Sequence, residues 1–342
     1  MNTLLEYFWL LLGCLLTWIW VDALANKRWA HLFTDIPNSR SSHTKTTPRG
    51  AGFAFAISVL SASLLTKTYI FISICAFLLA VVGLFDDIYS IKAKWRFATQ
   101  FGIAAAATAQ IFPGLEQALP AHISLCILTL LVMLSSINFY NFADGINGHA
   151  AIQFMITLIS WLLISNSRDT WVLNFNNSIF LTLLGSLIYF LYANLKLKSV
   201  FMGDSGSTFL GFLSATFPFA MLSEGADLHC YLLCLLSVLI FSYVIFLDCA
   251  SIVVIKISIG VSPSHPHRNH LYQRLSRQPG WNHTLVSIIL GLVQALLSFS
   301  YIASIFIAME FFYVTIIIGL FYSAVVIRNS LQTRKVFQLE AI

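Results

Sequence analysis

The chain has 342 residues, of which 58% are hydrophobic and only 10% are charged, and its formal net charge at pH 7 is +5. Soluble domains average about 25% charged residues, so this composition excludes a water-soluble globular protein. Apolar stretches of roughly 17–25 residues, each long enough to cross ~30 Å of hydrocarbon as a helix, recur along the chain. The composition therefore predicts an all-α polytopic membrane protein that forms one domain over residues 1–342, lies in the lipid bilayer and binds no nucleic acid.

The hydropathy pattern predicts about eleven membrane-spanning helices. A tight turn near Lys67 joins the second to the third, and short runs containing Pro, Gly, Ser or Asn separate several others. The expected spans are residues 4–24, 50–66, 68–85, 95–112, 121–137, 149–165, 177–195, 207–222, 228–250, 284–308 and 311–327.

The basic residues predict the orientation of these spans. If the N-terminus lies outside, every one of the 19 lysines and arginines except Lys67 and Arg168 falls on the inner side. Cytoplasmic loops of membrane proteins carry an excess of Lys and Arg. We therefore expect the N-terminus outside and the C-terminus in the cytoplasm.

Three polar segments interrupt the apolar pattern where predicted spans meet the cytoplasm. They are Asp86-Asp87, residues 138–148 and residues 201–207. Carboxylates that border hydrocarbon are costly to place, and those that persist usually line a water-filled cavity, an ion path or a catalytic site. Four of them at one depth favour a site for a divalent cation and phosphate: Asp86, Asp87, Asp144 and Asp204.

Each segment has a functional and a structural interpretation. Asp86 and Asp87 point about 100° apart on a helix, so one can reach a metal ion while the other acts as a base; the alternative is a solvated helix end. Residues 138–148 offer oxygens that suit Mg²⁺ or sugar hydroxyls, or form an Asx-rich turn. Asp204 precedes a span, where it can hold Mg²⁺ beside a bound phosphate or cap the helix.

Two basic loops lie on the same predicted face. The loop at residues 256–283 contains His265, His267, Arg268 and His270, a combination that suits diphosphate binding better than a transition-metal site. The first loop contributes further candidates for phosphate contacts, although by itself it is an ordinary positive-inside loop. These candidates are Lys45 and Arg49.

Together these motifs resemble the polyprenyl-phosphate N-acetylhexosamine-1-phosphate transferase family, glycosyltransferase family 4. The resemblance spans about residues 35–275. The residues that carry it are Asp35-Ile-Pro37-Asn38 with Thr47-Pro48-Arg49-Gly50; Asp86-Asp87 with Lys94 and Gln100; Asn138, Asn141, Asp144, Gly145, Asn147 and Gly148; Met202-Gly203-Asp204-Ser205-Gly206-Ser207; and His265, His267 and His270.

The resemblance implies transfer of an N-acetylhexosamine 1-phosphate from a UDP-sugar to undecaprenyl phosphate, with release of UMP. It also implies a multi-pass protein of the bacterial inner membrane, with a periplasmic N-terminus and an active site that faces the cytoplasm. The resemblance is compatible with a homodimer. The expected cofactor is Mg²⁺, with Mn²⁺ as the alternative ion.

The resemblance also implies roles for individual residues. Asp86, Asp87 and Asp204 are the implied catalytic residues, and one of the adjacent pair would act on the lipid phosphate. The implied Mg²⁺ ligands are Asp204, Asp144 and Asp87. The residues implied in substrate binding are Lys45, Arg49, Asn138, Asn141, Asp144, Asn147, His265, His267, Arg268 and His270.

Two departures from the family pattern narrow the expected substrate. Position 147 is Asn where many members carry Asp, and the loop reads His-Pro-His-Arg-Asn-His rather than as consecutive histidines. The second departure argues against a peptidoglycan substrate and favours the branch of the family that initiates O-antigen or related surface glycans. The peptidoglycan phospho-MurNAc-pentapeptide translocase remains the alternative. The sugar could then be GlcNAc, QuiNAc or FucNAc. We expect Asp248 to support the structure rather than the chemistry.

The main rival hypothesis is a secondary transporter that couples transport to ions through its carboxylates. Transporter sites lie near the membrane midplane, often between inverted repeats. Here the carboxylates fall at the inner interface, and the sequence has no convincing repeat. A non-catalytic membrane scaffold is the third hypothesis.

Overall fold

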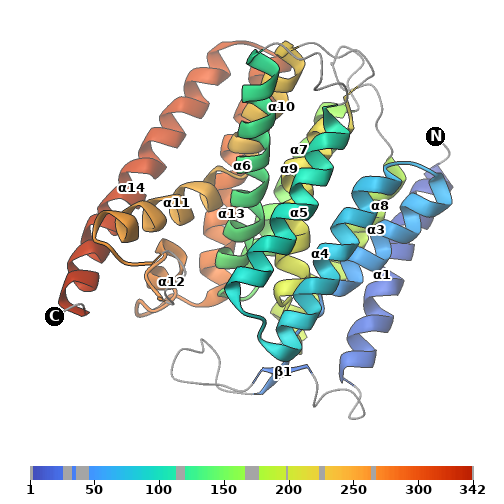
Figure 1. Ribbon diagram of the computed structural model, residues 1–342, viewed down its shortest axis with the longest axis horizontal. Helices are drawn as coiled ribbons and strands as arrows, with labels where there is room; N and C mark the ends of the chain where they lie inside the picture. The colour runs from blue at the N-terminus through green and yellow to red at the C-terminus, as the bar shows by residue number, and fades with distance from the viewer. Residues whose placement is uncertain are drawn as a thin grey trace.

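The computed structural model describes residues 3–25, 33–35, 46–112, 120–165, 177–197, 199–222, 228–262 and 267–340, and nearly all of them are helical (Figure 1). The helices are α1 (Thr3–Ala25), α3 (Phe53–Thr66), α4 (Ile70–Tyr89), α5 (Ala93–Ile111), α6 (Pro120–Ala143), α7 (His149–Ser165), α8 (Asn177–Leu191) with its π-helical continuation η2 (Tyr192–Leu197), α9 (Asp204–Ala220), α10 (Leu228–Phe241), α11 (Tyr243–Ser258), α12 (Leu271–Leu275), α13 (His283–Phe306) and α14 (Glu310–Glu340).

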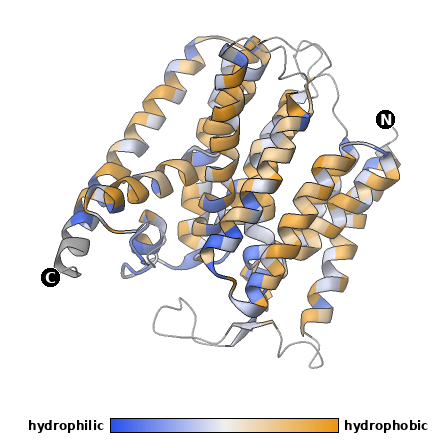
Figure 2. Cartoon of the chain, viewed as in Figure 1, coloured by the Kyte–Doolittle hydropathy of each residue, from blue (hydrophilic) through white to orange (hydrophobic). Residues whose placement is uncertain are grey.

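The prediction of an all-α membrane protein is confirmed. Within the described residues, six helices are long and apolar enough to cross a membrane, and α10 with α11 makes a seventh if the bent pair is one span. α3 and α7 are apolar but shorter. Figure 2 shows that hydrophobic residues cover most of the bundle, while hydrophilic residues gather toward the end that carries β1 and α12. Each predicted span overlaps a helix of the structure. Judged by length and hydropathy, however, these helices support fewer membrane crossings than the eleven predicted.

The predicted span 228–250 is wrong as one continuous helix, because α10 and α11 meet at an angle of 79°. In an unbroken helix the Val244 N–H would donate to the Ile240 carbonyl. Instead the buried Gln294 side chain of α13 accepts from the Val244 N–H at 3.0 Å and donates to the Ile240 carbonyl at 2.8 Å. A side chain inserted into the backbone ladder is a recognised cause of a helix kink.

Replacing Gln294 with leucine should therefore destabilise the bundle. The substitution leaves the Val244 N–H and the Ile240 carbonyl without their present partner in a buried region. Losing such partners costs about 1–3 kcal/mol. We expect a lower melting temperature for Gln294→Leu in detergent. An unchanged melting temperature would show that the amide does not stabilise the break.

α9 lies inside the bundle and determines where the polar end of the structure begins. Every residue from Ser205 to Phe219 is buried, and α9 packs against α4 and α6. The hydroxyls of Ser136 in α6 and Ser214 in α9 lie 2.6 Å apart, which gives two polar groups partners inside the core. The first residue of this central helix is Asp204.

The segment before α3 fixes the start of α9 from the other side. Strands β1 (Thr34–Asp35) and β2 (Thr47–Pro48) pair antiparallel. The Phe201 N–H donates to the Pro48 carbonyl at 2.7 Å, and the Gly52 N–H donates to the Met202 carbonyl at 3.0 Å. The first basic loop and the segment that leads into α9 are therefore neighbours.

Candidate active site

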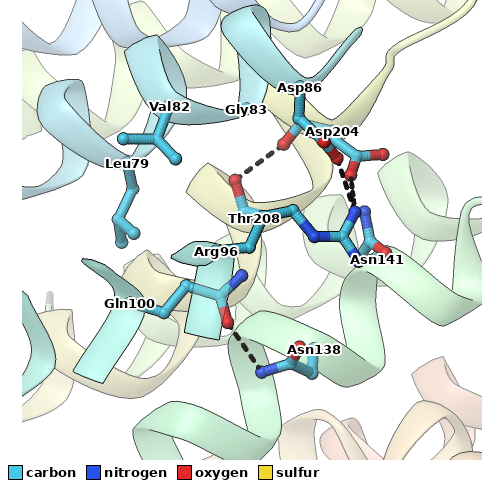
Figure 3. A pocket seen from close by; sticks show the side chains of 10 residues that line it. All are labelled: Leu79, Val82, Gly83, Asp86, Arg96, Gln100, Asn138, Asn141, Asp204 and Thr208. Atoms are coloured by element: carbon cyan, nitrogen blue, oxygen red, sulfur yellow. Dashed lines mark hydrogen bonds and ion pairs between the residues drawn. The ribbon is translucent and has the colours of Figure 1, made fainter. Parts of the chain in front are cut away.

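A pocket lies where the ends of α4 and α6 meet the starts of α5 and α9 (Figure 3). Polar residues from all four helices face it, together with apolar residues of α4. The lining residues are Leu79, Val82, Gly83, Asp86, Arg96, Gln100, Asn138, Asn141, Asp204 and Thr208. The structure thus brings together four of the residues that the sequence singled out, namely Asp86, Asn138, Asn141 and Asp204.

Arg96, at the start of α5, joins two carboxylates of this pocket. Its Nη1 lies 3.0 Å from Asp204 Oδ2 and also contacts Asp86 Oδ2. The second oxygen of Asp86 accepts from the Ile91 N–H at 2.6 Å. An arginine fork can hold two oxygens at once. Arg96 therefore places a fixed positive charge between carboxylates of α4 and α9.

Asp87 points toward the first backbone amides of α9 rather than into the pocket. Its Oδ1 accepts from the Asp204 N–H at 3.0 Å, and its Oδ2 accepts from the Ser205 N–H at 3.3 Å. The side chain is only 1% exposed, and Arg49 Nε lies 3.7 Å from Oδ1. A carboxylate at this end of a helix satisfies free N–H groups and complements the helix dipole. Asp87 therefore holds the start of α9 in place.

The segment that follows α6 brings further oxygen atoms to the same region. Asn138 Nδ2 donates to Gln100 Oε1 at 3.1 Å, and Asn141 Nδ2 donates to Ser207 Oγ at 3.1 Å. Burial raises the pKa of the Asp144 carboxyl well above its usual range, and the charges of Asp204 and Asp87 add to the rise. The carboxylates of three segments are thus close enough to repel one another.

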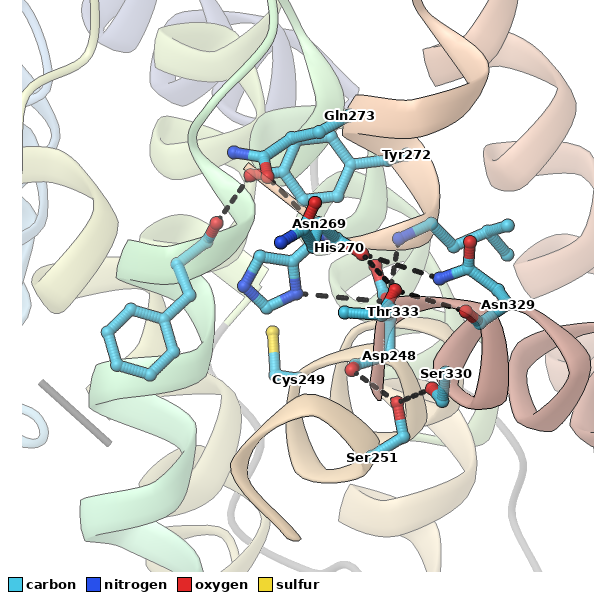
Figure 4. Close-up of polar contacts among 12 residues, drawn as sticks. Asp248, Cys249, Ser251, Asn269, His270, Tyr272, Gln273, Asn329, Ser330 and Thr333 are labelled. Carbon is cyan, nitrogen blue, oxygen red and sulfur yellow. Dashed lines mark hydrogen bonds and ion pairs between the residues drawn. The ribbon is translucent and has the colours of Figure 1, made fainter. Parts of the chain in front are cut away.

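The histidine loop is tied to the end of α6 and to α11 (Figure 4). The Tyr272 hydroxyl donates to the Phe142 carbonyl at 2.6 Å, and the Leu271 N–H donates to Asp248 Oδ1 at 2.9 Å. His270 takes part in the capping box of α12 and is buried. The ring centroids of His267 and His270 are 4.7 Å apart. The loop therefore packs directly beside the polar segment that contains Asp144.

Comparison with known proteins adds independent information. Residues 69–222, from the start of α4 to the end of α9, match the model of glycosyl transferase family 4. All three acidic segments lie within this stretch. This match supports the resemblance of the motifs to glycosyl transferase family 4. Members of this family are transferases, so the family resemblance of the motifs is confirmed.

Three relatives illustrate the similarity of this chain to known proteins. A decaprenyl-phosphate N-acetylglucosaminephosphotransferase of Mycolicibacterium smegmatis is 29% identical over 84% of this chain and 78% of its own length. A probable undecaprenyl-phosphate N-acetylglucosaminyl 1-phosphate transferase of Bacillus subtilis is 27% identical over 78% and 75%. An undecaprenyl-phosphate alpha-N-acetylglucosaminyl 1-phosphate transferase of Yersinia pestis is 26% identical over 77% and 74%.

The other predicted site residues that the structure describes lie outside the pocket lining. Arg49 donates to the backbone carbonyl of Asp87, and Ser287 donates through its hydroxyl to the Asn147 carbonyl at 2.8 Å. Lys45 and His265 fall outside the described residues. The sequence analysis did not identify Arg96 as a site residue and counted it only among the charges that predict membrane orientation. Nothing local in the sequence reveals that Arg96 reaches Asp204.

The oxygen atoms at this site suit Mg²⁺, which prefers carboxylate and carbonyl ligands. Burial and, to a lesser extent, the charges of Asp204 and Asp87 raise the pKa of Asp144, and a bound cation would offset this repulsion. Over the described ranges, however, no three His, Cys, Asp or Glu side chains already converge as a metal site. Of the three predicted ligands, Asp204 and Asp144 fit this role, whereas both oxygens of Asp87 already accept hydrogen bonds from α9.

The close approach of α4 and α9 depends on Gly83. A Cβ at this position would lie 2.5 Å from the Asp204 carbonyl oxygen and 2.6 Å from the Ser205 nitrogen. Both are backbone atoms, so α4 and α9 would have to separate. We expect Gly83→Ala to lower turnover about tenfold, because about 1.4 kcal/mol of lost transition-state stabilisation has this effect. Steady-state kinetics of the purified protein would measure the change.

Gly102→Ala is the matched control for this prediction. Gly102 lies on α5, and a Cβ added there would meet nothing within 4 Å. The control variant should keep wild-type turnover. Equal turnover in Gly83→Ala and Gly102→Ala would contradict the packing argument.

Proposed function

We propose that this protein transfers an N-acetylhexosamine 1-phosphate from a UDP-sugar to undecaprenyl phosphate and releases UMP. The observation that carries the proposal is the pocket in which Arg96 joins Asp86 to Asp204 beside Asn141. The names of the three relatives support a polyprenyl-phosphate acceptor and favour GlcNAc as the sugar. The product would initiate O-antigen or a related surface polysaccharide.

In this reaction an oxygen of the lipid phosphate attacks the β-phosphorus of the UDP-sugar. The bond from the β-phosphorus to the bridging oxygen breaks, and UMP leaves with the electron pair. The catalytic requirement is to position two phosphates and to offset their negative charge. Arg96 lies at the pocket and can serve both needs.

Asp86 is the better candidate to act on the lipid phosphate. It lines the pocket, whereas Asp87 holds the start of α9. The second pKa of a phosphate monoester is near 6, so only a weak base is needed to keep the nucleophile deprotonated. Asp204 and Asp144 would hold Mg²⁺, which when bound supplies positive charge to the phosphate oxygens.

We place the protein in the bacterial inner membrane, with the pocket facing the cytoplasm and the N-terminus in the periplasm. The distribution of Lys and Arg supports this orientation, because all but two of the 19 fall on one side when the chain is divided into the eleven predicted spans. Arg49 and Arg96 lie at the pocket end of the bundle, as this orientation requires. Lys67, one of the two exceptions, ends α3 at the connection to α4.

One observation favours the transporter as a second candidate. Transporters often use broken helices, and α10 and α11 form such a pair. Gln294 satisfies the free backbone groups at that break, however, and none of the residues at the break lines the acidic pocket. The break therefore offers less for ion coupling than the pocket offers for phosphate transfer.

A proteoliposome assay separates the two candidates. The purified protein is reconstituted with or without undecaprenyl phosphate, and UDP-GlcNAc and Mg²⁺ are added. The transferase hypothesis predicts release of UMP only when the lipid phosphate and Mg²⁺ are both present. Uptake of intact UDP-GlcNAc without cleavage would support the transporter and exclude the transferase.

A further inference from the structure

The C-terminal half of α14 buries an unusual set of polar side chains. Asn329, Ser330 and Thr333 are 7%, 4% and 0% exposed, whereas many of the apolar residues earlier in this helix are exposed. Buried polar groups need hydrogen-bond partners. Ser330 Oγ donates to Ser251 Oγ of α11 at 2.8 Å. The other two side chains face the histidine loop, as Figure 4 shows.

The contacts between α14 and the loop involve two loop residues. Asn329 Nδ2 and Thr333 Oγ1 each lie 3.4 Å from the Asn269 carbonyl oxygen. Arg274 Nη1 donates to the Asn329 carbonyl at 3.1 Å, and its Nη2 donates to Gln332 Oε1 at 2.8 Å. Together these hydrogen bonds hold the loop against one turn of α14.

This arrangement separates the three arginines of the described loop by role. Arg274 is engaged by α14, and Arg277 donates to the carbonyls of Gln273 and Arg268. Arg268 differs, because its Nη2 is buried and has no hydrogen-bond partner within the described residues. A buried guanidinium nitrogen without a partner is costly unless a ligand supplies an oxygen. Arg268 is therefore the arginine of this loop that remains available for phosphate.

The contacts from α14 lie next to this available arginine. Asn269, whose carbonyl faces α14, directly follows Arg268, and two residues further on the Leu271 N–H is held by Asp248. The backbone is thus fixed on both sides of His270. Loss of the α14 contacts removes a restraint next to Arg268 and leaves this side held by the hydrogen bond from Arg277 to the Arg268 carbonyl.

We propose that residues 329–333 of α14, together with Arg274, position Arg268 and His267 for the donor phosphate. This proposal rests on the proposed function for the identity of the ligand. Asn329, Thr333 and Arg274 are positioning residues in it and touch no substrate. It assigns to the last helix of the chain, which lies beyond the stretch that matches the family model, a part in donor recognition.

The test compares Thr333→Val and Arg274→Gln with wild type. We expect the KM for UDP-GlcNAc to rise about tenfold, the effect of weakening one charge-assisted hydrogen bond. The value of kcat and the KM for undecaprenyl phosphate should stay within about twofold, because neither substitution touches the acidic pocket. Amide hydrogen exchange over residues 267–277 should become faster in both variants.

Two control variants make the test specific. Thr333→Ser keeps the hydroxyl and should restore wild-type KM and exchange. Ser323→Ala removes a hydroxyl from the same helix, where it lies 2.7 Å from Tyr243 Oη and away from the loop, and it should change neither value. If Thr333→Val does not fold, Asn329→Ala, which removes the other side-chain contact to the Asn269 carbonyl and keeps Arg274, takes its place in the comparison.

The outcomes distinguish positioning from direct phosphate binding by Arg274. If Arg274 bound phosphate itself, Arg274→Gln would raise the KM while Thr333→Val would not, and that result would overturn the proposal. If α14 positions the loop, the two substitutions raise the KM alike and are not additive. Hydrogen exchange needs no substrate, so unchanged exchange in both variants overturns the inference even if UDP-GlcNAc proves to be the wrong donor.

Discussion

Asp204→Asn should lower kcat by about 10²–10³ while the protein still folds and inserts, the size of effect that loss of one electrostatic contact to a transition state produces. The substitution removes the charge that faces Arg96 at 3.0 Å and one of the two carboxylates that fit Mg²⁺. The amide has nearly the same shape, and the contact of α9 with Gly83 involves backbone atoms of Asp204 and Ser205 rather than the Asp204 side chain. The variant should therefore lose activity without losing stability.

Turnover of UDP-GlcNAc and the melting temperature in detergent should be measured on the same preparation. Asp22→Asn is the matched control, because Asp22 is an exposed carboxylate of α1 and should tolerate the same change without loss of turnover. Full activity in Asp204→Asn would remove Asp204 from the chemistry and would leave it only as the first residue of α9.

Arg96→Gln should produce the second large effect, with turnover reduced by about 10²-fold, in the range for a lost charge-assisted contact at a reacting centre. Without the guanidinium, Asp86 and Asp204 lose the cation that both of them contact. The two carboxylates then repel each other without a cation between them. The measurement is kcat and KM for both substrates.

Two further variants locate this effect. Arg96→Lys should recover only part of the activity, because an ammonium is a point charge that cannot bridge two carboxylates in the same geometry. Lys92→Gln removes an exposed charge from the same connection and should have wild-type kinetics. If Arg96→Gln and Lys92→Gln behaved alike, the loss would reflect general surface charge rather than the bridge.

Much of the fold could be predicted from the sequence because a membrane-spanning helix is a continuous apolar stretch, which local hydropathy detects. The predicted span 228–250 was wrong as one helix because its break depends on Gln294, about fifty residues away. The apolar run itself is uninterrupted at Ser242, so local hydropathy carries no sign of the bend. Only a tertiary contact reveals it.

The candidate site shows the same division between local and distant information. Asp86, Asn138, Asn141 and Asp204 were recognisable as polar groups at the ends of apolar runs, and they line one pocket. The different orientations of Asp86 and Asp87 also follow from helix geometry.

What the sequence could not supply was the partner of each side chain. Asp87 holds the amides of α9, His270 takes part in a helix cap, and Arg96 reaches a residue more than a hundred positions away. These contacts depend on how helices approach one another, for example at Gly83. Composition and spacing do not encode such an approach directly.

The most direct test of the central claim follows the β-phosphate of the donor. Purified protein is incubated with UDP-GlcNAc labelled with ³²P at the β-position, undecaprenyl phosphate and Mg²⁺, and the lipid and water-soluble products are separated and identified. Transfer of the sugar 1-phosphate predicts that the label enters a lipid diphosphate-GlcNAc and that the released UMP is unlabelled. Label left in a soluble nucleotide, or a lipid that gains the sugar without the labelled phosphate, would contradict it.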